Sequence, residues 1–275
     1  DGNQSGSVVT MDSGEDTTCV VTGLTLMNGS GSLIDGGGSV LNGGGIIILN
    51  SSPKIEYCQI DSNFCHQGSG IYFKHSFAII RNCSFSNNWF TEPINSQVLC
   101  PQWSEVKILS CRIDNNDCGA ISSYGSTNTF QNNVITRNYF GGSFSHLDQV
   151  LNTKIIDNEG GIEMRGSSQI VNSIIAGNGS VNGGIGIMLY NSGTVTVNNC
   201  TISNNAGYGI YNRNSELILL NSIIYNNVSG SIDTVNNPIL NISYSNIDQD
   251  WPGVGNINSD PNFIDPSSGY YRISD

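Results

Sequence analysis

The chain has 275 residues, a formal net charge of −12 at pH 7 and only 10 Lys and Arg residues. This balance argues against a nucleic-acid partner, whose binding requires clustered basic side chains. No apolar run approaches the roughly 20 residues of a membrane span, so we expect no membrane insertion by this segment.

An asparagine recurs along the chain at intervals of roughly 20–28 residues. Its positions are Asn63, Asn88, Asn116, Asn138, Asn158, Asn178, Asn205 and Asn227. An apolar residue lies three positions before each of them, from Ile60 to Ile224. Such self-similarity predicts a solenoid, in which each unit buries its apolar face by stacking on its neighbours. We expect the asparagine amides to hydrogen-bond along the rod.

A second column of residues sets the register. Its members are Cys58, Cys83, Cys111, Asn133, Thr153, Ser173, Cys200 and Ser222, and an apolar residue lies three positions before each. An odd spacing between two inward positions predicts a bend, since a flat strand would change faces there. Adding Leu24 and Ser245 at the two ends gives about ten coils. With no helical periodicity, the predicted fold is all-β: a parallel β-helix rising about 4.8 Å per coil.

A short strand opened by glycine precedes most of these segments, as in residues 45–48, 161–164 and 186–189. Glycine permits the tight corner that each turn needs. Counting from this corner, we expect the second and fourth strand residues to point outward. The second positions are Ile47, Tyr72, Leu99, Ser122, Phe144, Glu163, Met188 and Tyr211. The fourth positions are Leu49, Lys74, Pro101, Tyr124, His146, Arg165, Tyr190 and Arg213.

Aromatic rings beside basic side chains on this face suit a sugar chain lying along the rod. The candidate glycan-binding residues are Tyr72, Lys74, Tyr124, His146, Glu163, Arg165, Tyr190, Tyr211 and Arg213. Exposed sheet positions favour Tyr and Arg in any case, so an ordinary sheet surface is the alternative interpretation.

Two motifs carry a resemblance to known proteins. Residues 85–88, Phe-Ser-Asn-Asn, fit an FxxN repeat, and the Gly-Gly-Ile sequences at 44–46 and 160–162 resemble GGAI repeats. Both are typical of polymorphic outer-membrane proteins, and the segment from Ser243 to Pro266 resembles the closing segment of secreted pectin-lyase-like repeat proteins. The resemblance implies a right-handed β-helix that is secreted or exposed on a cell surface.

We expect residues 1–250 to form the solenoid and residues 251–275 an irregular cap of the same domain. A stack of parallel strands exposes unpaired edges at its end, and the aromatic, proline-containing tail suits a cover for them. The first residues already read as a coil, so we expect the chain to be an excerpt of a longer precursor.

The eight cysteines do not predict a disulfide framework. Cys58, Cys83, Cys111 and Cys200 share the register column, and Cys100 is expected to point inward. In-register side chains on parallel strands point the same way, so their Cβ atoms do not reach disulfide distance. Cys65 and Cys118 are interpreted as turn residues about two coils apart, too far for a shared metal.

The carboxylates give little support for a glycosidase. Asp61, Asp114 and Asp248 share a turn column, but no pair falls on one predicted strand. No metal site is predicted, and no cofactor is expected; calcium stays open without a motif that indicates it.

Two functions from different classes remain. The first is a non-enzymatic extracellular or cell-surface module, adhesive or glycan-binding, whose partner is a polysaccharide or the surface of a host or neighbouring cell. The alternative is a polysaccharide lyase or hydrolase of the pectin-lyase-like class, with Lys74, Tyr124, His146 and Arg165 available for cation and base roles. The acidic composition disfavours a polyanionic substrate, so we favour the module and nominate no catalytic residue.

Overall fold

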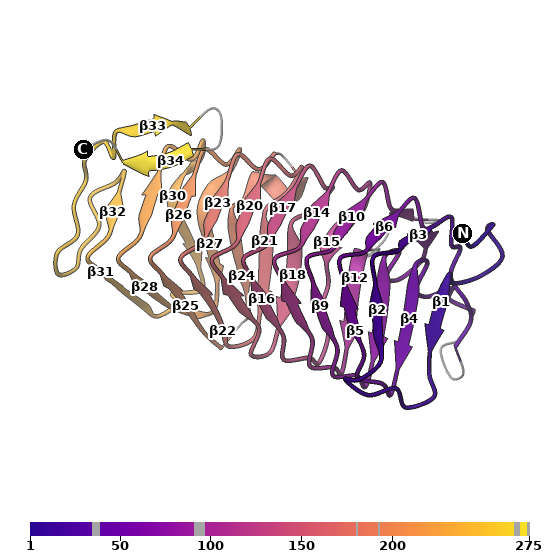
Figure 1. The fold of residues 1–275 in the computed structure, drawn as a ribbon. Coiled ribbons are helices and arrows are strands. Elements are labelled where there is room, and N and C mark those ends of the chain that lie inside the picture. Colours follow the sequence, from indigo (N-terminus) through magenta and orange to yellow (C-terminus); the bar gives the residue numbers. More distant parts are fainter. Residues whose placement is uncertain (35–38, 91–96, 180, 192, 267–269, 274–275) are drawn as a thin grey trace.

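The computed structural model describes residues 1–34, 39–90, 97–179, 181–191, 193–266 and 270–273. The chain winds into a three-sided rod of parallel strands, with the two termini at opposite ends (Figure 1). The predicted all-β class, a parallel β-helix, is confirmed. Within the described residues the only helix is the short 3-10 turn η1 (Val181–Gly184), and no helix is long and apolar enough to cross a membrane.

Two of the three sides are continuous sheets of ten strands each. The side that carries the apolar residues three positions before the register column, such as Ile55, consists of β2 (Val20–Thr22), β5 (Lys54–Glu56), β9 (Ile79–Arg81), β13 (Lys107–Leu109), β16 (Thr129–Gln131), β19 (Gln149–Leu151), β22 (Ser168–Val171), β25 (Thr194–Asn198), β28 (Glu216–Leu220) and β31 (Leu240–Ser243). The side that carries the apolar residues three positions before the asparagine column, such as Ile60, consists of β3 (Thr25–Met27), β6 (Gln59–Asp61), β10 (Ser84–Ser86), β14 (Arg112–Asp114), β17 (Val134–Thr136), β20 (Lys154–Ile156), β23 (Ile174–Ala176), β26 (Thr201–Ser203), β29 (Ile223–Tyr225) and β32 (Asn246–Ile247).

The remaining side, called the binding face below because the candidate glycan-binding residues of the sequence analysis fall on it, is built from two sheets of five strands. The first contains β1 (Val9–Met11), β4 (Ile46–Leu49), β8 (Ile71–Lys74), β12 (Gln97–Gln102) and β15 (Gly119–Ile121), and the second contains β18 (Gly142–Ser145), β21 (Ile162–Arg165), β24 (Ile187–Tyr190), β27 (Tyr208–Arg213) and β30 (Gly230–Val235). Isolated bridges from Gly119 to Phe140 and from Ser122 to Ser143 join them. A further pair, β7 (Phe64–Cys65) and β11 (Trp89–Phe90), extends the coils on one edge.

The predicted apolar columns are in register and form the core. Ile55, Ile80 and Ile108 pair on adjacent strands, as do Ile60 and Phe85, and all five side chains are buried. The residue just before each register position has a positive φ, for example 54° at Asn82 and 58° at Asn132. This left-handed residue makes the bend that the odd spacing predicted, and asparagine tolerates that conformation better than most side chains.

The asparagine column forms a continuous buried ladder. The Asn88 side chain accepts a bond from the Asn63 backbone N–H at 3.1 Å, and its Nδ2 donates to Asn116 Oδ1 at 3.0 Å. The same pattern repeats from Asn116 through Asn205 to Asn227. Among the described residues no buried side-chain polar atom lacks a hydrogen-bond partner, so this polar column costs little to bury.

The tail closes the last coil in part and then turns back along the rod. Trp251 packs on the core, and Asn256 and Ile257 bond to the backbone of β31 and of Ser245 to Ile247. Beyond them, β33 (Phe263–Asp265) and β34 (Tyr270–Ile273) form an antiparallel hairpin that lies beside the rod in Figure 1. Asn204 contacts Tyr271 of this hairpin at 3.3 Å, so the hairpin covers a flank, not the end. Residues 267–269 and 274–275 of the predicted cap lie outside the described residues.

Candidate functional site

The binding face presents two outward columns of side chains. In the column of fourth positions, strand pairing aligns Lys74 with Gln102, Gln102 with Tyr124, and Tyr190 with Arg213. Tyr124 is 62% exposed and Tyr190 37% exposed, and Arg165 and Arg213 are exposed as well. Glu163 and Tyr211 occupy the neighbouring second positions and are half-buried.

Three expectations for this face are wrong. Tyr72 lies in the outward column but is only 3% exposed, because Gly68 packs directly against its backbone and Gln102 accepts a bond from its hydroxyl. Burial raises the pKa of the Tyr72 phenol to about 12. His146 is not in line with Arg165: Ser145 is the residue that pairs with Arg165, and His146 makes the following turn with φ 56°.

The third error concerns register. Leu99 and Phe144, expected to point outward, pair with the inward residues Ile71 and Met164 and are fully buried. Pro101 is also buried, opposite Phe73, and the outward fourth position belongs to Gln102, which is half-buried. Cys100 pairs with Tyr72, so it lies in the outward column and not in the inward position expected. Like Tyr72, it is buried there.

An aromatic ladder that the sequence analysis missed lies where the first five-stranded sheet turns toward the next side of the rod. It consists of His75, Trp103 and Tyr124. The ring centroids of His75 and Trp103 are 5.8 Å apart and nearly parallel, and those of Trp103 and Tyr124 are 5.3 Å apart and perpendicular. Trp103 is 48% exposed although it has a positive φ of 44°. The coil spacing could have located Trp103, because Trp103 follows Gln102 as His75 follows Lys74.

The basic residues farther along the face are already engaged within the surface. Arg165 binds Glu163 through two hydrogen bonds of 2.8 and 3.0 Å, and the guanidinium of Arg213 stacks on the Tyr190 ring at 4.9 Å. The hydrogen bond that Arg165 donates to Glu163 raises the pKa of Arg165. Glu163, Arg165, Tyr190 and Arg213 are called the arginine–tyrosine patch, and each arginine in it is held by a neighbouring side chain.

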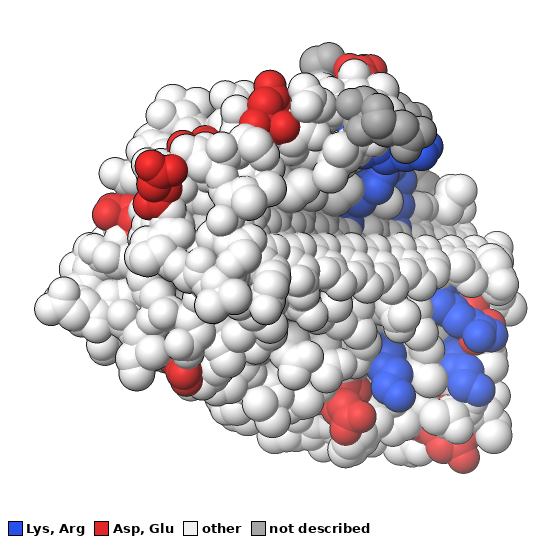
Figure 2. All heavy atoms as spheres, turned by 90° about the vertical axis from the view of Figure 1, so that its left-hand side faces the viewer, with Lys and Arg blue, Asp and Glu red and all other residues white. Residues whose placement is uncertain are grey.

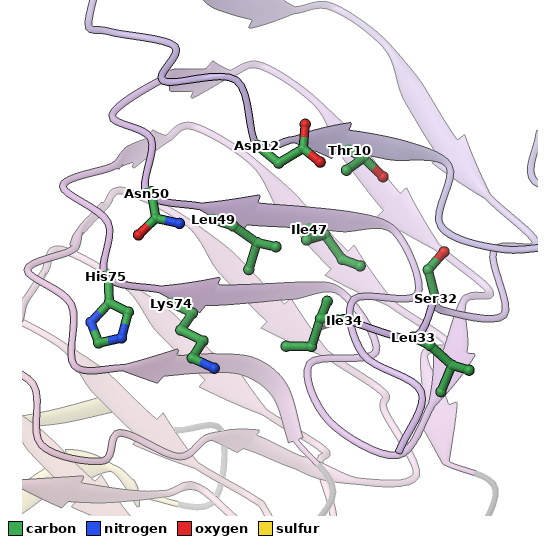
Figure 3. Close-up of a pocket in the computed structure, with 10 residues that line it drawn as sticks. All are labelled: Thr10, Asp12, Ser32, Leu33, Ile34, Ile47, Leu49, Asn50, Lys74 and His75. Carbon is green, nitrogen blue, oxygen red and sulfur yellow. The ribbon is translucent and has the colours of Figure 1, made fainter. Parts of the chain in front are cut away.

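A pocket of about 500 Å³ opens at the other end of the ladder, over β1, β4 and β8 (Figure 3). Four aliphatic side chains form its floor and one wall: Leu33, Ile34, Ile47 and Leu49. The polar groups around it come from Thr10, Asp12, Ser32, Asn50, Lys74 and His75. Since His75 belongs to both the pocket and the aromatic ladder, the two features are continuous.

Asp148 and seven of the eight thiols are buried beneath the surface of the rod. Asp148 is fully buried, and burial raises the pKa of its carboxyl to about 6 against hydrogen bonds from Ser123, Asn128 and Ser145. Asp114, expected in a turn, is the last residue of β14, where it pairs with Arg137 and Arg112, and the hydrogen bond from Arg137 lowers its pKa. No described cluster of three His, Cys, Asp or Glu side chains could hold a metal ion.

All eight cysteines are free, as expected, and Cys58, Cys83 and Cys111 are buried in adjacent coils. Of the two residues interpreted as turn residues, Cys118 lies in the bend before β15, as expected, whereas Cys65 lies on β7. Both are buried, and Cys65 is close to Cys100 and Cys118. Burial raises the pKa of each of these three thiols to about 12. They are therefore poor nucleophiles.

The residues nominated for the lyase alternative are not brought together. Lys74 lies on β8 and Arg165 on β21, with β12, β15 and β18 between them, a separation of roughly 19 Å at the usual strand spacing.

Figure 2 views the rod from the C-terminal end and shows a surface with few charged side chains, on which the Lys and Arg residues lie toward the right-hand side. The arrangement suits hydrogen bonding and stacking along a long ligand more than it suits chemistry at one point.

Comparison with known proteins agrees with this architecture. The family described as right handed beta helix region matches residues 9–169 and 148–266. No curated protein matches the sequence.

Three solved structures illustrate the range of proteins with a similar fold. The A-module of mannuronan C-5 epimerase AlgE4 of Azotobacter vinelandii is 13% identical over 86% of this chain and 82% of that chain, with a TM-score of 0.48. A rhamnogalacturonan lyase is 12% identical over 94% of this chain and 81% of that chain, with a TM-score of 0.44. PfbA, a surface adhesin of Streptococcus pneumoniae, is 12% identical over 82% of this chain and 74% of that chain, with a TM-score of 0.35. The family match extends over most of the chain, and the protein described here belongs to the right-handed β-helix family.

Proposed function

We propose that this chain is an extracellular carbohydrate-binding module that holds a polysaccharide along its binding face. The observation that carries the proposal is the aromatic ladder of His75, Trp103 and Tyr124. Large exposed rings in a row are unusual on a surface without a ligand, since they leave apolar area in water. Sugar rings carry apolar C–H faces and polar edges, which suits rings that stack and neighbouring groups that donate hydrogen bonds.

The arginine–tyrosine patch extends this surface along the rod. Arg165 is fixed by Glu163, and Arg213 is fixed by its stacking on Tyr190, so these side chains lose little further freedom when a ligand binds. The net charge of −12 favours a neutral polysaccharide over a polyanionic one, because long-range repulsion acts on any acidic chain that approaches. Adhesion to a cell surface through such a chain is the role we propose for the module.

The test is binding of the purified protein to a panel of neutral and acidic polysaccharides, followed by calorimetry. We expect the Trp103→Ala, Tyr124→Ala double variant to bind about 30- to 1,000-fold more weakly, because two stacking surfaces of about 1–2 kcal/mol each are lost. A matched control is Tyr57→Ala, Tyr244→Ala, which removes two exposed tyrosines from another edge of the rod. The control should bind as tightly as the wild type.

Three outcomes would overturn the proposal. One is the absence of binding to any polysaccharide in the panel, and another is equal loss of binding in the control variant. The third is the appearance of an unsaturated uronate product, detected by its ultraviolet absorbance, which would identify the chain as a lyase.

A further inference from the structure

The pocket beside the aromatic ladder differs in chemistry from the ladder itself. Its floor carries Ile47 and Leu49 of β4, and Ile34 and Leu33 lie across from them on the segment before residue 35 (Figure 3). Among the described residues that line it, His75 carries the only aromatic ring. An aliphatic floor offers no flat surface for stacking a sugar ring, but it holds a small apolar substituent well.

Asp12 and Lys74 carry opposite charges at the ends of the two strands that flank this floor. Asp12 follows β1 and Lys74 ends β8, and β4 with its two aliphatic side chains lies between those strands. A carboxylate accepts a hydrogen bond from an amide N–H, and an ammonium donates one to an amide C=O or a hydroxyl. Asn50 and His75 add further donors and acceptors on the side nearest the ladder.

The shape of the pocket limits how a ligand enters. Figure 3 shows Leu33 and Ile34 at one end of the strands and Asn50 and His75 at the opposite end. The volume of about 500 Å³ lies within the roughly 300–1,000 Å³ typical of small-ligand sites. A chain that runs along Trp103 and reaches His75 would place only its last unit over the aliphatic floor.

We propose that this pocket binds an acylated terminal sugar, such as an N-acetylhexosamine, with the acyl methyl against the partly exposed Leu49 and Ile34 and the amide hydrogen-bonded to Asp12 or Lys74. The inference rests on the proposed function and deepens it, since it makes the module selective for the substitution at the chain end. The ladder supplies contact with the chain, and the pocket supplies discrimination by its aliphatic floor.

The test uses two monosaccharides that differ at one position, methyl N-acetylglucosaminide and methyl glucoside. We expect saturation-transfer NMR with the whole protein to show binding of the first, with the largest transfer to its acetyl methyl. The second should bind at least about tenfold more weakly, as expected when an apolar pocket loses a methyl-sized group. Because single sugars need no contact with Trp103 or Tyr124, this result is independent of polysaccharide binding.

A variant that fills the pocket tests whether the acetylated sugar binds at this place in the structure. Thr10→Trp adds a large side chain at an exposed strand position on the rim, so it should block the acetylated sugar without opening a core cavity. Thr25→Trp, at an exposed position of β3 on another side, is the matched control and should bind normally.

Equal binding of the two sugars, no binding of the acetylated sugar, or normal binding by Thr10→Trp would overturn the pocket assignment. If the wild type binds the acetylated sugar but no polysaccharide, the proposed function is wrong and the pocket assignment stands.

Discussion

Asp148 shows how one charged residue fits into an otherwise neutral column of the rod. Its Oδ1 accepts hydrogen bonds from the backbone N–H and the side chain of Asn128 at 2.8 and 3.0 Å, and its Oδ2 accepts from Ser145 N–H at 2.9 Å and from the Ser123 hydroxyl. Complete burial raises the pKa of Asp148 by more than these four hydrogen bonds lower it. No cation is among the groups that act on this pKa. The protonated carboxyl is therefore the better-tolerated form.

The stability of the rod should depend on pH through this residue. Because the pKa of Asp148 is raised from 3.8 to about 6 on folding, the folded state binds more protons than the unfolded state between about pH 4 and 6. Its contribution to stability is full below that window and is lost as the pH rises through it, by at most about 3 kcal/mol. Asp148→Asn should remove this dependence.

The measurement is urea denaturation of the wild type and of Asp148→Asn at a series of pH values. The difference in unfolding free energy between them should change in favour of the variant from pH 4 to 7. Carboxylates with lowered pKa values, such as Asp114, act in the opposite direction but are common to both proteins, so the difference isolates Asp148. A constant difference across the window would contradict the burial argument.

At the scale of the element, the sequence predicted two sides of each coil and misplaced part of the third. The columns around the register position were predicted correctly because a buried apolar residue and a buried asparagine recur in every coil there. On the binding face the strand positions were counted from a glycine, and this starting point is wrong in two coils. Val98, the second residue of β12, replaces the corner glycine, and two glycines in succession precede Ser143, which shifts the count by one.

The cover over Tyr72 and Cys100 could not be predicted from the repeat. Segments between coils, such as residues 65–69, follow no period, and their packing depends on tertiary contacts.

The aromatic ladder was missed for a related reason. Trp103 and His75 lie in left-handed turn positions just outside the strands, which the alternation of a strand does not describe.

The asparagine ladder should contribute strongly to stability. Asn116→Ala removes the acceptor of both the Asn88 backbone N–H and the Asn88 side-chain amide, and both groups are buried. Each buried donor left without a partner costs about 1–3 kcal/mol, so we expect a loss of at least about 2 kcal/mol in urea denaturation. Asn241→Ala, on an exposed strand position, should change stability by less than about 0.5 kcal/mol. Similar values for the two variants would contradict the role of the ladder.

At the scale of the whole molecule, the cysteines act as core residues with no covalent role. Seven of the eight are buried, and Cys19 is the half-exposed one. We expect a thiol reagent to titrate eight thiols in denaturant without reductant, and about one, Cys19, rapidly in the native protein. A count clearly below eight in denaturant would reveal a disulfide.

The stability of the rod as a whole should depend on how its C-terminal end is closed. Trp251 packs on the core, Asn256 bonds to Ile242, and Ile257 pairs with Ser245 and Ile247, so these residues satisfy groups that the last coil would otherwise expose. A chain ending at Asp250 would leave those backbone groups and the apolar core open, and unpaired parallel edges favour association. We expect it to melt at a lower temperature and to aggregate.

The hairpin of β33 and β34 provides the matched control. A chain ending at Asp260 keeps the residues that close the last coil, including the bonds between Asn246 and Ser259, and loses only the hairpin on the flank. The hairpin contacts Asn204 through Tyr271, far from the exposed strand edges, so its removal should lower the melting temperature only slightly. Calorimetry and light scattering of both truncations measure this directly. If the chain ending at Asp250 stays monomeric and as stable as the chain ending at Asp260, the residues from Trp251 to Ile257 do not protect the end of the rod.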